Sequence, residues 1–362
     1  MLDKLKLGSF WRSKSFQLFL VAAAILAVMP VLIRDSFFLY VWTLIFIFAI
    51  YATSWNFLAN SGQGSLGHAV FLGIGGFASA IIGSKISLTI TGWLGVDALP
   101  AVLGALVQVS VVLIGGLLSA GIGSLIGLAC VRLKAWYLAM VTFGFSVIAS
   151  SLSSQFDSIT HGISGFAPTA LVAGRFSFYI LVISFALSSI GIMYLIMKSR
   201  IGLAFRAIHG NEAEARMIGI NTAKYKLIAF VISTFFAGIA GGLYVYFIGF
   251  VDNSIFSPTN SFLPLIMTVI GGLGTVSGPV IGSIFLTSVG QILTTQGVTK
   301  TLSATLGPFF PKVGYVGPPL TYLIIGVILL LIVIFSPKGL TSLFSKFYNY
   351  LNTPENKEAK PQ

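Results

Sequence analysis

Long apolar runs separated by short polar breaks occupy most of the chain. A helix needs roughly 20 residues to cross about 30 Å of hydrocarbon, and most of the runs approach this length. Their apolar positions are continuous, whereas a membrane β-barrel requires apolar and polar positions to alternate. The pattern therefore predicts an all-α, polytopic membrane helical bundle of eight to ten spans, with discontinuous or re-entrant segments. The expected apolar segments are Phe16–Ile33, Phe37–Leu58, Gly67–Gly83, a stretch within Leu99–Cys130, Trp136–Leu152, Phe178–Met197, Leu227–Phe250, Phe262–Ile270, Pro279–Leu293 and Pro319–Phe335.

Basic residues predict the orientation of the bundle. The first run follows several Lys and Arg residues and ends without a small-residue cleavage site, so we interpret it as an uncleaved span. If the N-terminus is inside, alternation leaves all but five of the 21 Lys and Arg residues on the cytoplasmic side. Loops rich in these residues stay in the cytoplasm, so we expect both termini there. The five residues outside are Arg34, Lys85, Arg175, Lys300 and Lys312.

Two of the apolar segments are short for full crossings. Phe262–Ile270 holds nine residues and Pro279–Leu293 holds fifteen. Because Asp252 is expected outside and Lys338 inside, an odd number of crossings must separate them. The short pair therefore crosses twice, or enters and returns on one side. Ten spans and eight spans plus a re-entrant hairpin both satisfy the charge rule.

Composition excludes the soluble classes. Charged residues make up 8 % of the chain, against about a quarter in a typical soluble domain, and the mean hydropathy is +0.97. The net charge of +12 lies in loops and forms no basic face, so we expect no nucleic-acid partner. Cys130 is the single cysteine and excludes an internal disulfide; no metal or cofactor site is expected. Residues 1–351 form the predicted transmembrane domain, and the polar residues 352–362 a disordered cytoplasmic tail.

The break Asn60–His68, with the sequence NSGQGSLGH, lies between two predicted spans. Its glycines free the backbone, and its neutral polar side chains are candidates to line a solute pathway: Asn60, Gln63, Ser65 and His68. Non-helical backbone in lipid survives only inside protein or beside an aqueous cavity. A helix starting near Ser65 would direct its free N–H groups at the break, which suits a carboxylate-bearing solute. The alternatives are a tight loop at the membrane surface and, for His68, a hydrogen-bonded packing residue.

A second break, Gly271–Gly278, separates the two short apolar segments and reads GGLGTVSG. Such a break is typical of a discontinuous helix pair. Gly271, Gly272 and Gly274 are therefore further candidates for the solute pathway. The alternative is a structural turn or a site of close helix packing.

The predicted cytoplasmic loop Lys198–Lys226 is long enough to hold an element of its own. Asn211 with Glu214 three residues later resembles a capping box, and Arg216 follows Glu212 by four residues. Gly219 then ends the run. We predict a short helix of about seven residues, which either seats in a groove of another protein or rests on lipid headgroups.

Several features are missing from the apolar segments. They contain no Asp, Glu, Lys or Arg, whereas proton- and sodium-coupled carriers usually need ionisable groups within the membrane. No paired carboxylates or nucleophile–base motif lies at membrane depth, so we expect no enzyme. The chain also has no GxxxxGK[ST] sequence. If ATP drives this protein, another chain binds it.

At these same segments the chain resembles the LivM branch of the branched-chain amino-acid ABC transporter permeases. The matching strings are NSGQGSLGHAVFLGIGGFASA (Asn60–Ala80), VRLKAWYLAMVTFGF (Val131–Phe145), SRIGLAFRAIHGNEAEARMIGINTAKYKLIAFVISTFFAGIAGGLY (Ser199–Tyr244), VIGGLGTVSGPVIG (Val269–Gly282) and FSPKGL (Phe335–Leu340). They occur in the family's order over most of the chain. The importer signature EAA-x3-G matches loosely at Ala213–Gly219, and the family's Gly- and Asn-rich periplasmic stretch reads THGISGF (Thr160–Phe166).

The resemblance implies the permease subunit of an ATP-binding-cassette importer for branched-chain or similar small hydrophobic amino acids, in the inner (plasma) membrane of a bacterium. The implied partners are a homologous second permease subunit, two cytoplasmic ATPase subunits, a periplasmic substrate-binding protein and the lipid bilayer. The family's ATPase-coupling region corresponds to Arg200–Gly219, so the expected coupling residues are Arg206, Asn211, Glu212, Glu214, Arg216 and Gly219. The remaining alternatives are an ABC permease for urea or short amides, a stand-alone secondary carrier, and a membrane enzyme or scaffold.

Overall fold

The computed structural model describes residues 35–95, 99–131, 133, 135–295, 317–336 and 339–341. Every regular element in this part of the chain is a helix. Phe166 and Val251 form an isolated β-bridge. The all-α prediction is therefore confirmed for the described residues. Several sequence predictions concern residues outside this part of the chain: Phe16–Ile33, Arg34, Lys300, Lys312, Lys338 and the tail 352–362.

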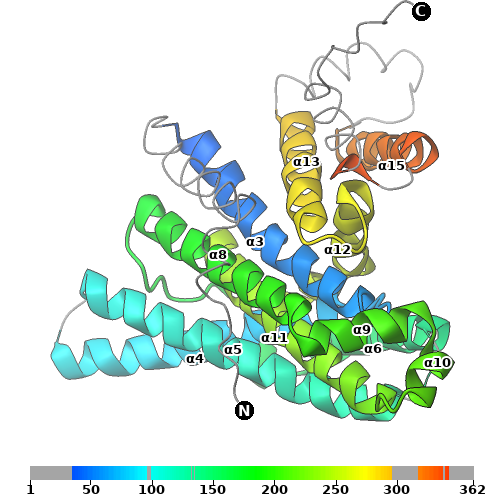
Figure 1. The fold of residues 1–362 in the computed structure, drawn as a ribbon. Helices are drawn as coiled ribbons and strands as arrows, with labels where there is room; N and C mark the ends of the chain where they lie inside the picture. Colours follow the sequence, from blue (N-terminus) through cyan, green and yellow to red (C-terminus); the bar gives the residue numbers. More distant parts are fainter. Residues whose placement is uncertain are drawn as a thin grey trace, which may run out of the picture.

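The described elements follow one another from α3 to α15 (Figure 1). They are α3 (Ser36–Ala59), α4 (Ala69–Leu94), α5 (Ala101–Cys130), α6 (Ala135–Gln155), α7 (Asp157–Thr160), α8 (Arg175–Lys198), α9 (Arg200–Gly210), α10 (Glu212–Met217), α11 (Thr222–Ile248), the 3-10 helix η1 (Asn253–Phe256), α12 (Pro258–Gly271), α13 (Ser277–Thr294) and α15 (Gly317–Phe335). Within the described residues, seven helices are long and apolar enough to cross a membrane: α3, α4, α5, α6, α8, α11 and α13. The protein is thus a multi-pass helical bundle, and the span count stays a prediction.

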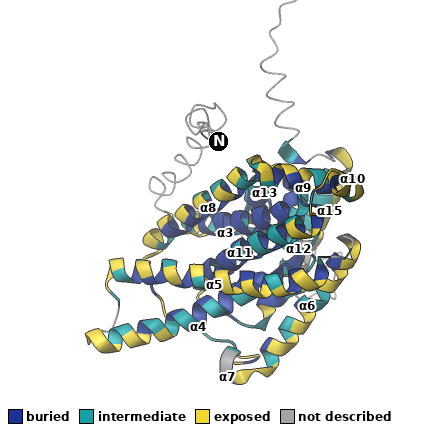
Figure 2. Ribbon diagram, turned by 60° about the horizontal axis from the view of Figure 1, so that its bottom comes forward, coloured by how far each residue is buried: buried dark blue, intermediate teal, exposed yellow. Residues whose placement is uncertain are grey.

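Helices α3 and α11 form the centre of the bundle. In Figure 2 both are coloured mainly as buried, whereas α4, α5, α6 and α8 also carry exposed faces. The two central helices run antiparallel: the rings of Tyr40 and Phe247 lie 5.0 Å apart near one end, and the Ser233 hydroxyl donates to the Ser54 carbonyl 2.7 Å away farther along. Figure 1 shows α12, α13 and α15 together on one side of α3, with α4 and α5 on the other.

Small residues bring α4, α5 and α11 into backbone contact. A Cβ atom on Gly75 would lie 2.2 Å from the Gly238 carbonyl oxygen, and one on Gly241 would lie 1.8 Å from that of Leu72. The hydroxyl of Ser119 donates to the carbonyls of Phe71 and Thr234, at 3.1 and 2.8 Å. Small residues of this kind let membrane helices approach closely and gain dispersion energy that larger side chains would prevent.

Three helices, α4, α8 and α11, extend beyond the predicted apolar segments, so the helices contain charged residues although those segments do not. Helix α8 has Arg175 at its start and Lys198 at its end. Helix α11 begins at Thr222, five residues before the predicted segment, and so contains Lys224 and Lys226. Helix α4 continues past Gly83 to Leu94 and contains Lys85, which is exposed. The hydropathy pattern marks only the apolar part of a helix, while the backbone hydrogen bonds continue through polar turns.

The close contact between α4 and α11 can be tested by filling it. We expect Gly75→Val to separate the two helices and to lower stability by about 1–3 kcal/mol or more, as overpacking of a tight core does. The control is Gly121→Val in α5, because a Cβ there meets nothing within 4 Å. The measurement is the thermal unfolding midpoint of the purified protein in detergent. Equal midpoints for the two variants would contradict the contact.

Candidate functional site

The segment Asn60–His68 is folded into the bundle between α3, α6 and α11. Two of its backbone groups bond to side chains of α3 and α6: Trp55 Nε1 donates to the Ser65 carbonyl (2.7 Å), and the Leu66 N–H donates to Thr142 Oγ1 (3.2 Å). Gln63 Nε2 donates to the Lys226 carbonyl at 2.9 Å. The segment is therefore non-helical backbone enclosed in protein, one of the two settings in which such backbone persists in lipid.

His68 lies at the start of α4 and is fully buried. Its Nε2 atom is 3.0 Å from Ser54 Oγ, and its ring stacks at a tilt near Tyr51, with centroids 5.3 Å apart. One ring nitrogen of His68 is therefore hydrogen-bonded, as the alternative of a packing histidine requires. The other nitrogen, Nδ1, has no hydrogen-bond partner in the described part of the chain, and neither does the buried Ser65 hydroxyl.

The break Gly271–Gly278 also has the predicted character. Helix α12 ends at Gly271 and α13 begins at Ser277, and Gly272 and Gly274 have positive φ angles of 126° and 79°. A Cβ on Gly271 would lie 1.7 Å from the Gly278 carbonyl oxygen. The segment is accordingly both a helix break and a place of close packing, so the two interpretations coexist here.

Asn56 of α3 brings the two breaks together. Its carboxamide accepts from the Gly274 N–H at 3.2 Å and donates to the Thr275 carbonyl at 2.8 Å. The Asn60 side chain donates to the Asn56 carbonyl at 2.8 Å, and Asn60 Oδ1 would lie 3.9 Å from a Cβ on Gly274. Sequence reasoning missed Asn56 because it lies within an apolar run; the available signal was an amide four residues before Asn60.

Gly339, in the string FSPKGL (Phe335–Leu340), packs against the break Gly271–Gly278. A Cβ on Gly339 would lie 2.5 Å from the Cα of Gly272. Leu340 contacts the small apolar cluster that includes Met267 and Leu286 of α12 and α13. Gly339 and Leu340 therefore lie against the break between these two helices.

The predicted short helix is present as α10, with six residues. Asn211 caps it by accepting from the N–H groups of Ala213 (3.0 Å) and Glu214 (3.4 Å), while its Nδ2 donates to Glu214 Oε1 at 2.7 Å. Gly219 follows with a φ of 85°. The capping arrangement and the glycine stop are therefore confirmed.

Helix α9 connects α10 to the bundle. The ring of Phe205 is buried against Phe57 of α3, with centroids 5.5 Å apart and an edge-to-face geometry. Arg206, the candidate coupling residue of α9, is exposed. On α10 and its cap, Met217 is 88 % exposed and Ile218 is 74 % exposed. These two apolar side chains have no cover from the described residues.

Lys226 is a site residue that sequence reasoning missed. It lies in the first turns of α11 with its side chain only 6 % exposed, and its Nζ atom is 2.5 Å from Glu212 Oε2. Arg216 Nη2 lies 2.5 Å from the other carboxylate oxygen, and Arg216 Nε donates to Thr222 Oγ1. Partial burial by itself raises the pKa of the Glu212 carboxyl, but hydrogen bonds from Lys226 and Arg216 outweigh it, so the pKa lies below its ordinary value.

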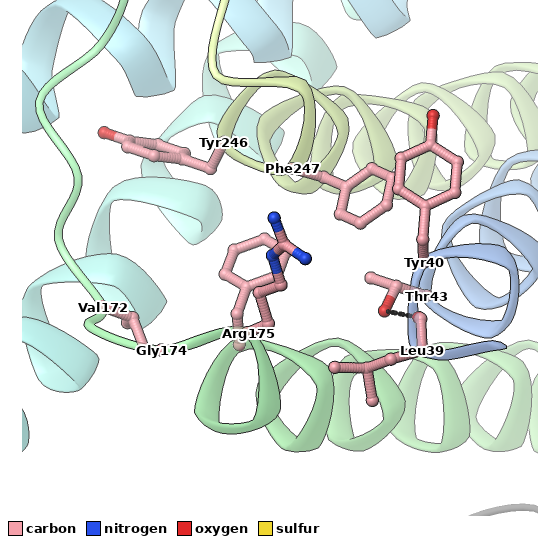
Figure 3. Close-up of a pocket in the computed structure, with 9 residues that line it drawn as sticks. Leu39, Tyr40, Thr43, Val172, Gly174, Arg175, Tyr246 and Phe247 are labelled. Atoms are coloured by element: carbon pink, nitrogen blue, oxygen red, sulfur yellow. Dashed lines mark hydrogen bonds between the residues drawn. The ribbon is translucent and has the colours of Figure 1, made fainter. Parts of the chain in front are cut away.

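A cavity of about 450 Å³ lies at the other end of α3, among aromatic side chains of three helices (Figure 3). It is lined by Leu39, Tyr40, Thr43, Val172, Gly174, Arg175, Phe178, Tyr246 and Phe247. Figure 3 shows the Arg175 guanidinium between Phe247 and the loop that carries Gly174, and it pairs with no carboxylate among the described residues. None of the predicted site residues lines this cavity. The described residues also contain no group of three or more His, Cys, Asp or Glu that could hold a metal ion.

Comparison with known proteins gives one family and several relatives. The family described as "Branched-chain amino acid transport system / permease component" matches residues 37–333. The high-affinity branched-chain amino acid transport system permease protein LivM of Escherichia coli is 28 % identical over 301 residues, covering 75 % of this chain and 67 % of the relative. LivM of Salmonella typhimurium is 26 % identical over 278 residues, covering 66 % of this chain and 65 % of the relative. The chain thus spans about two thirds of the length of these relatives.

A shorter match is the autoinducer 2 import system permease protein LsrC of Photorhabdus laumondii, 30 % identical over 105 residues, which are 26 % of this chain and 30 % of the relative. No solved structure matches this chain.

The carboxylate of Glu212 gives a pH prediction. Because its pKa is lowered in the folded protein, the stabilisation of α10 is complete above the ordinary value of 4.5 and is lost as the pH falls through the lowered value. Glu212→Gln should weaken the attachment of α10 by about 2 kcal/mol at neutral pH, between the values for exposed and buried ion pairs. Hydrogen exchange of the α10 amides, corrected for intrinsic rates, measures both effects. Glu212→Gln should lack the acid transition, and a transition of the same size in that variant would contradict the assignment.

Proposed function

The chain belongs to the family of permease components of branched-chain amino acid transport systems, and from this premise we propose that it conducts branched-chain or similar small hydrophobic amino acids inward as part of an ATP-driven importer. As a permease component it is a transport subunit and not a catalytic one. The observation that carries the proposal is the meeting of the two polar breaks at Asn56, next to the helix pair α9–α10. A movement of that helix pair can thus reach both breaks.

The solute pathway is proposed to form at these breaks. The candidates remain Asn60, Gln63, Ser65 and His68 with Gly271, Gly272 and Gly274. The unpartnered His68 Nδ1 atom and Ser65 hydroxyl support this assignment, because a buried polar group without a partner costs free energy. A second conformation in which they meet water or the polar ends of an amino acid would remove that cost.

The proposed partners are a homologous second permease, two cytoplasmic ATPase subunits, a periplasmic substrate-binding protein and the lipid of a bacterial inner membrane. The exposed side chains of Met217 and Ile218 support an ATPase seat at α10, since insertion into a protein groove would remove their apolar surface from water. The proposed coupling residues are Arg206, Asn211, Glu212, Glu214, Arg216 and Gly219. Both termini are proposed to be cytoplasmic.

We further propose ten spans, with η1 and α12 forming one discontinuous crossing. The support is the position of η1: the ring of Phe256 stacks on Phe77 of α4 at 5.7 Å, and its carbonyl accepts from Ser146 of α6 at 2.6 Å. Tyr51 of α3 donates to the Asn260 carbonyl at 3.0 Å. The 3-10 helix η1 and the first turn of α12 therefore pack against side chains within three long helices, as a break in a discontinuous helix does.

Two other functions compete with this one. A permease for urea or short amides would share the architecture, because the polar breaks offer neutral hydrogen-bonding groups and no charge. A stand-alone secondary carrier would need no ATPase. The buried Lys226 keeps this alternative open, since a buried ionisable residue in a membrane helix is a candidate for ion coupling.

Substitution at Gly219 tests the coupling role of α10. A Cβ at this glycine meets nothing within 4 Å, so a substitution acts through its positive φ alone. We expect Gly219→Val to displace α10, because the left-handed conformation costs a β-branched residue about 1–2 kcal/mol, and to lower uptake more than ATP hydrolysis. Gly219→Asn is the matched control, since Asn adopts this conformation more readily. Uptake and ATP hydrolysis are measured in the complex reconstituted into liposomes. Unchanged transport in the Val variant would exclude α10 as the docking element.

Competition for uptake tests the solute and the energy source together. In liposomes that contain this chain, the second permease, the two ATPases and the binding protein, or in cells with and without the two ATPases, labelled leucine should accumulate only when the ATPases are present. Unlabelled isoleucine and valine should compete because they bury similar apolar surface, whereas urea should not. Inhibition by urea would favour the amide permease. Accumulation without the ATPases, driven by an ion gradient, would favour the secondary carrier.

A further inference from the structure

The ion pair between Lys226 and Glu212 connects two parts of the site that the proposed function treats separately. Glu212 is the first residue of α10, and Lys226 lies on the buried face of α11. Fourteen residues separate them along the chain, yet Nζ and Oε2 are 2.5 Å apart. Helix α10 is thereby fixed to α11 as well as to α9.

Burial makes this attachment strong. A lysine ammonium removed from water needs a paired charge or hydrogen bonds, and the side chain of Lys226 is only 6 % exposed. Glu212 is its carboxylate partner among the described residues. Arg216 holds the second carboxylate oxygen, so the carboxylate is fixed from both sides. Moving α10 away from α11 would leave the ammonium buried and unpaired.

The same lysine is bonded on its other side to the polar loop. The carboxamide of Gln63 donates to the Lys226 carbonyl at 2.9 Å and to the Ser61 hydroxyl at 3.0 Å. Gln63 is 5 % exposed, so this contact is enclosed in protein. One residue of α11 therefore contacts α10 through its ammonium group and the segment Asn60–His68 through its backbone.

We propose that Lys226 is a positioning residue that transmits the displacement of α10 to the loop Asn60–His68. When a partner moves α10, the ion pair carries the first turns of α11 with it, and the Gln63 contact carries the loop. Lys226 neither touches the solute nor contacts the ATPase; it fixes the distance between the two sites. This inference rests on the proposed function of an ATP-driven permease.

A second contact between the helix pair and the loop exists and must be separated from the first. A Cβ atom on Gly62 would lie 3.4 Å from the Cα of His209 in α9. That contact is van der Waals packing without a hydrogen bond, and it does not involve Lys226. Variants of the ion pair leave it intact, so they test the electrostatic connection alone.

The test uses the complete complex in liposomes and measures the number of labelled leucine molecules transported per ATP hydrolysed. Lys226→Met alone removes the ammonium. Glu212→Gln with Lys226→Met removes both charges, and replacing a buried pair by neutral groups is often neutral for stability, so this double variant tests the connection even where the single one folds poorly. Lys226→Arg keeps the pair, and Lys224→Met removes an exposed lysine two residues away.

We expect leucine transported per ATP to fall about tenfold in Lys226→Met and in the double variant alike, the size of a typical coupling free energy between two sites. Lys226→Met leaves the proposed coupling residues of α10 unchanged, so this reduction belongs to the ion pair. Lys226→Arg and Lys224→Met should stay near the wild-type ratio. A merely structural role would lower the amount of folded protein without changing this ratio. A wild-type ratio in the double variant overturns the proposal.

A measurement on the wild-type complex complements the variants. ATP binding by the partner subunits should change the hydrogen exchange of the amides of residues 60–68. An unchanged exchange in a complex that transports leucine overturns the role of Lys226 while the proposed function stands. A wild-type complex that hydrolyses ATP without transporting leucine overturns the proposed function instead, so the two failures are distinguishable.

Discussion

The requirement that buried backbone groups find hydrogen-bond partners governs the structure more than any other interaction. Water is absent from the interior of a bilayer, so each interruption of a helix needs partners from within the protein. Here Trp55 and Thr142 satisfy backbone groups of the segment between α3 and α4, and Asn56 satisfies the break between α12 and α13. Because α3 contributes to both, the positions of the two interruptions depend on a single helix.

The sequence predicted the elements better than their connections. Continuous apolar runs locate the long helices, and the Asn211 cap with Gly219 locates α10, because these signals are local. Asn56 and Lys226 were missed for the opposite reason. Asn56 bonds to Gly274, which lies 218 residues away along the chain. Lys226 pairs with Glu212, which lies 14 residues away across a turn. No periodicity in the sequence encodes such pairings. Lys226 was also hidden by its place at the edge of an apolar run, where a lysine is usually expected to reach for water.

Hydrogen bonds and one ion pair thus link the surface helix α10 to the interior of the bundle in a few steps. Glu212 pairs with Lys226, and the Lys226 carbonyl accepts a hydrogen bond from Gln63, which belongs to the segment that holds His68. Neutral groups dominate the interior, and the one buried charged residue among the described residues, Lys226, lies at the α10 end. This arrangement suits the proposed subunit, which binds its solute weakly and takes energy from elsewhere. The cavity beside Arg175 lies at the opposite end of α3 and shares no lining residue with this chain of contacts.

The glycine contacts among α4, α5 and α11 have a mechanical consequence. Where carbonyl oxygens of one helix meet the Cα atoms of another, as at Gly75 and Gly241, there is no layer of side chains that can change rotamer and let the helices slide. These three helices therefore shift only as one rigid block. Larger side chains lie where α3 meets this block, as the rings of Tyr40 and Phe247 do, so we expect a passage for solute to open around the block rather than through it.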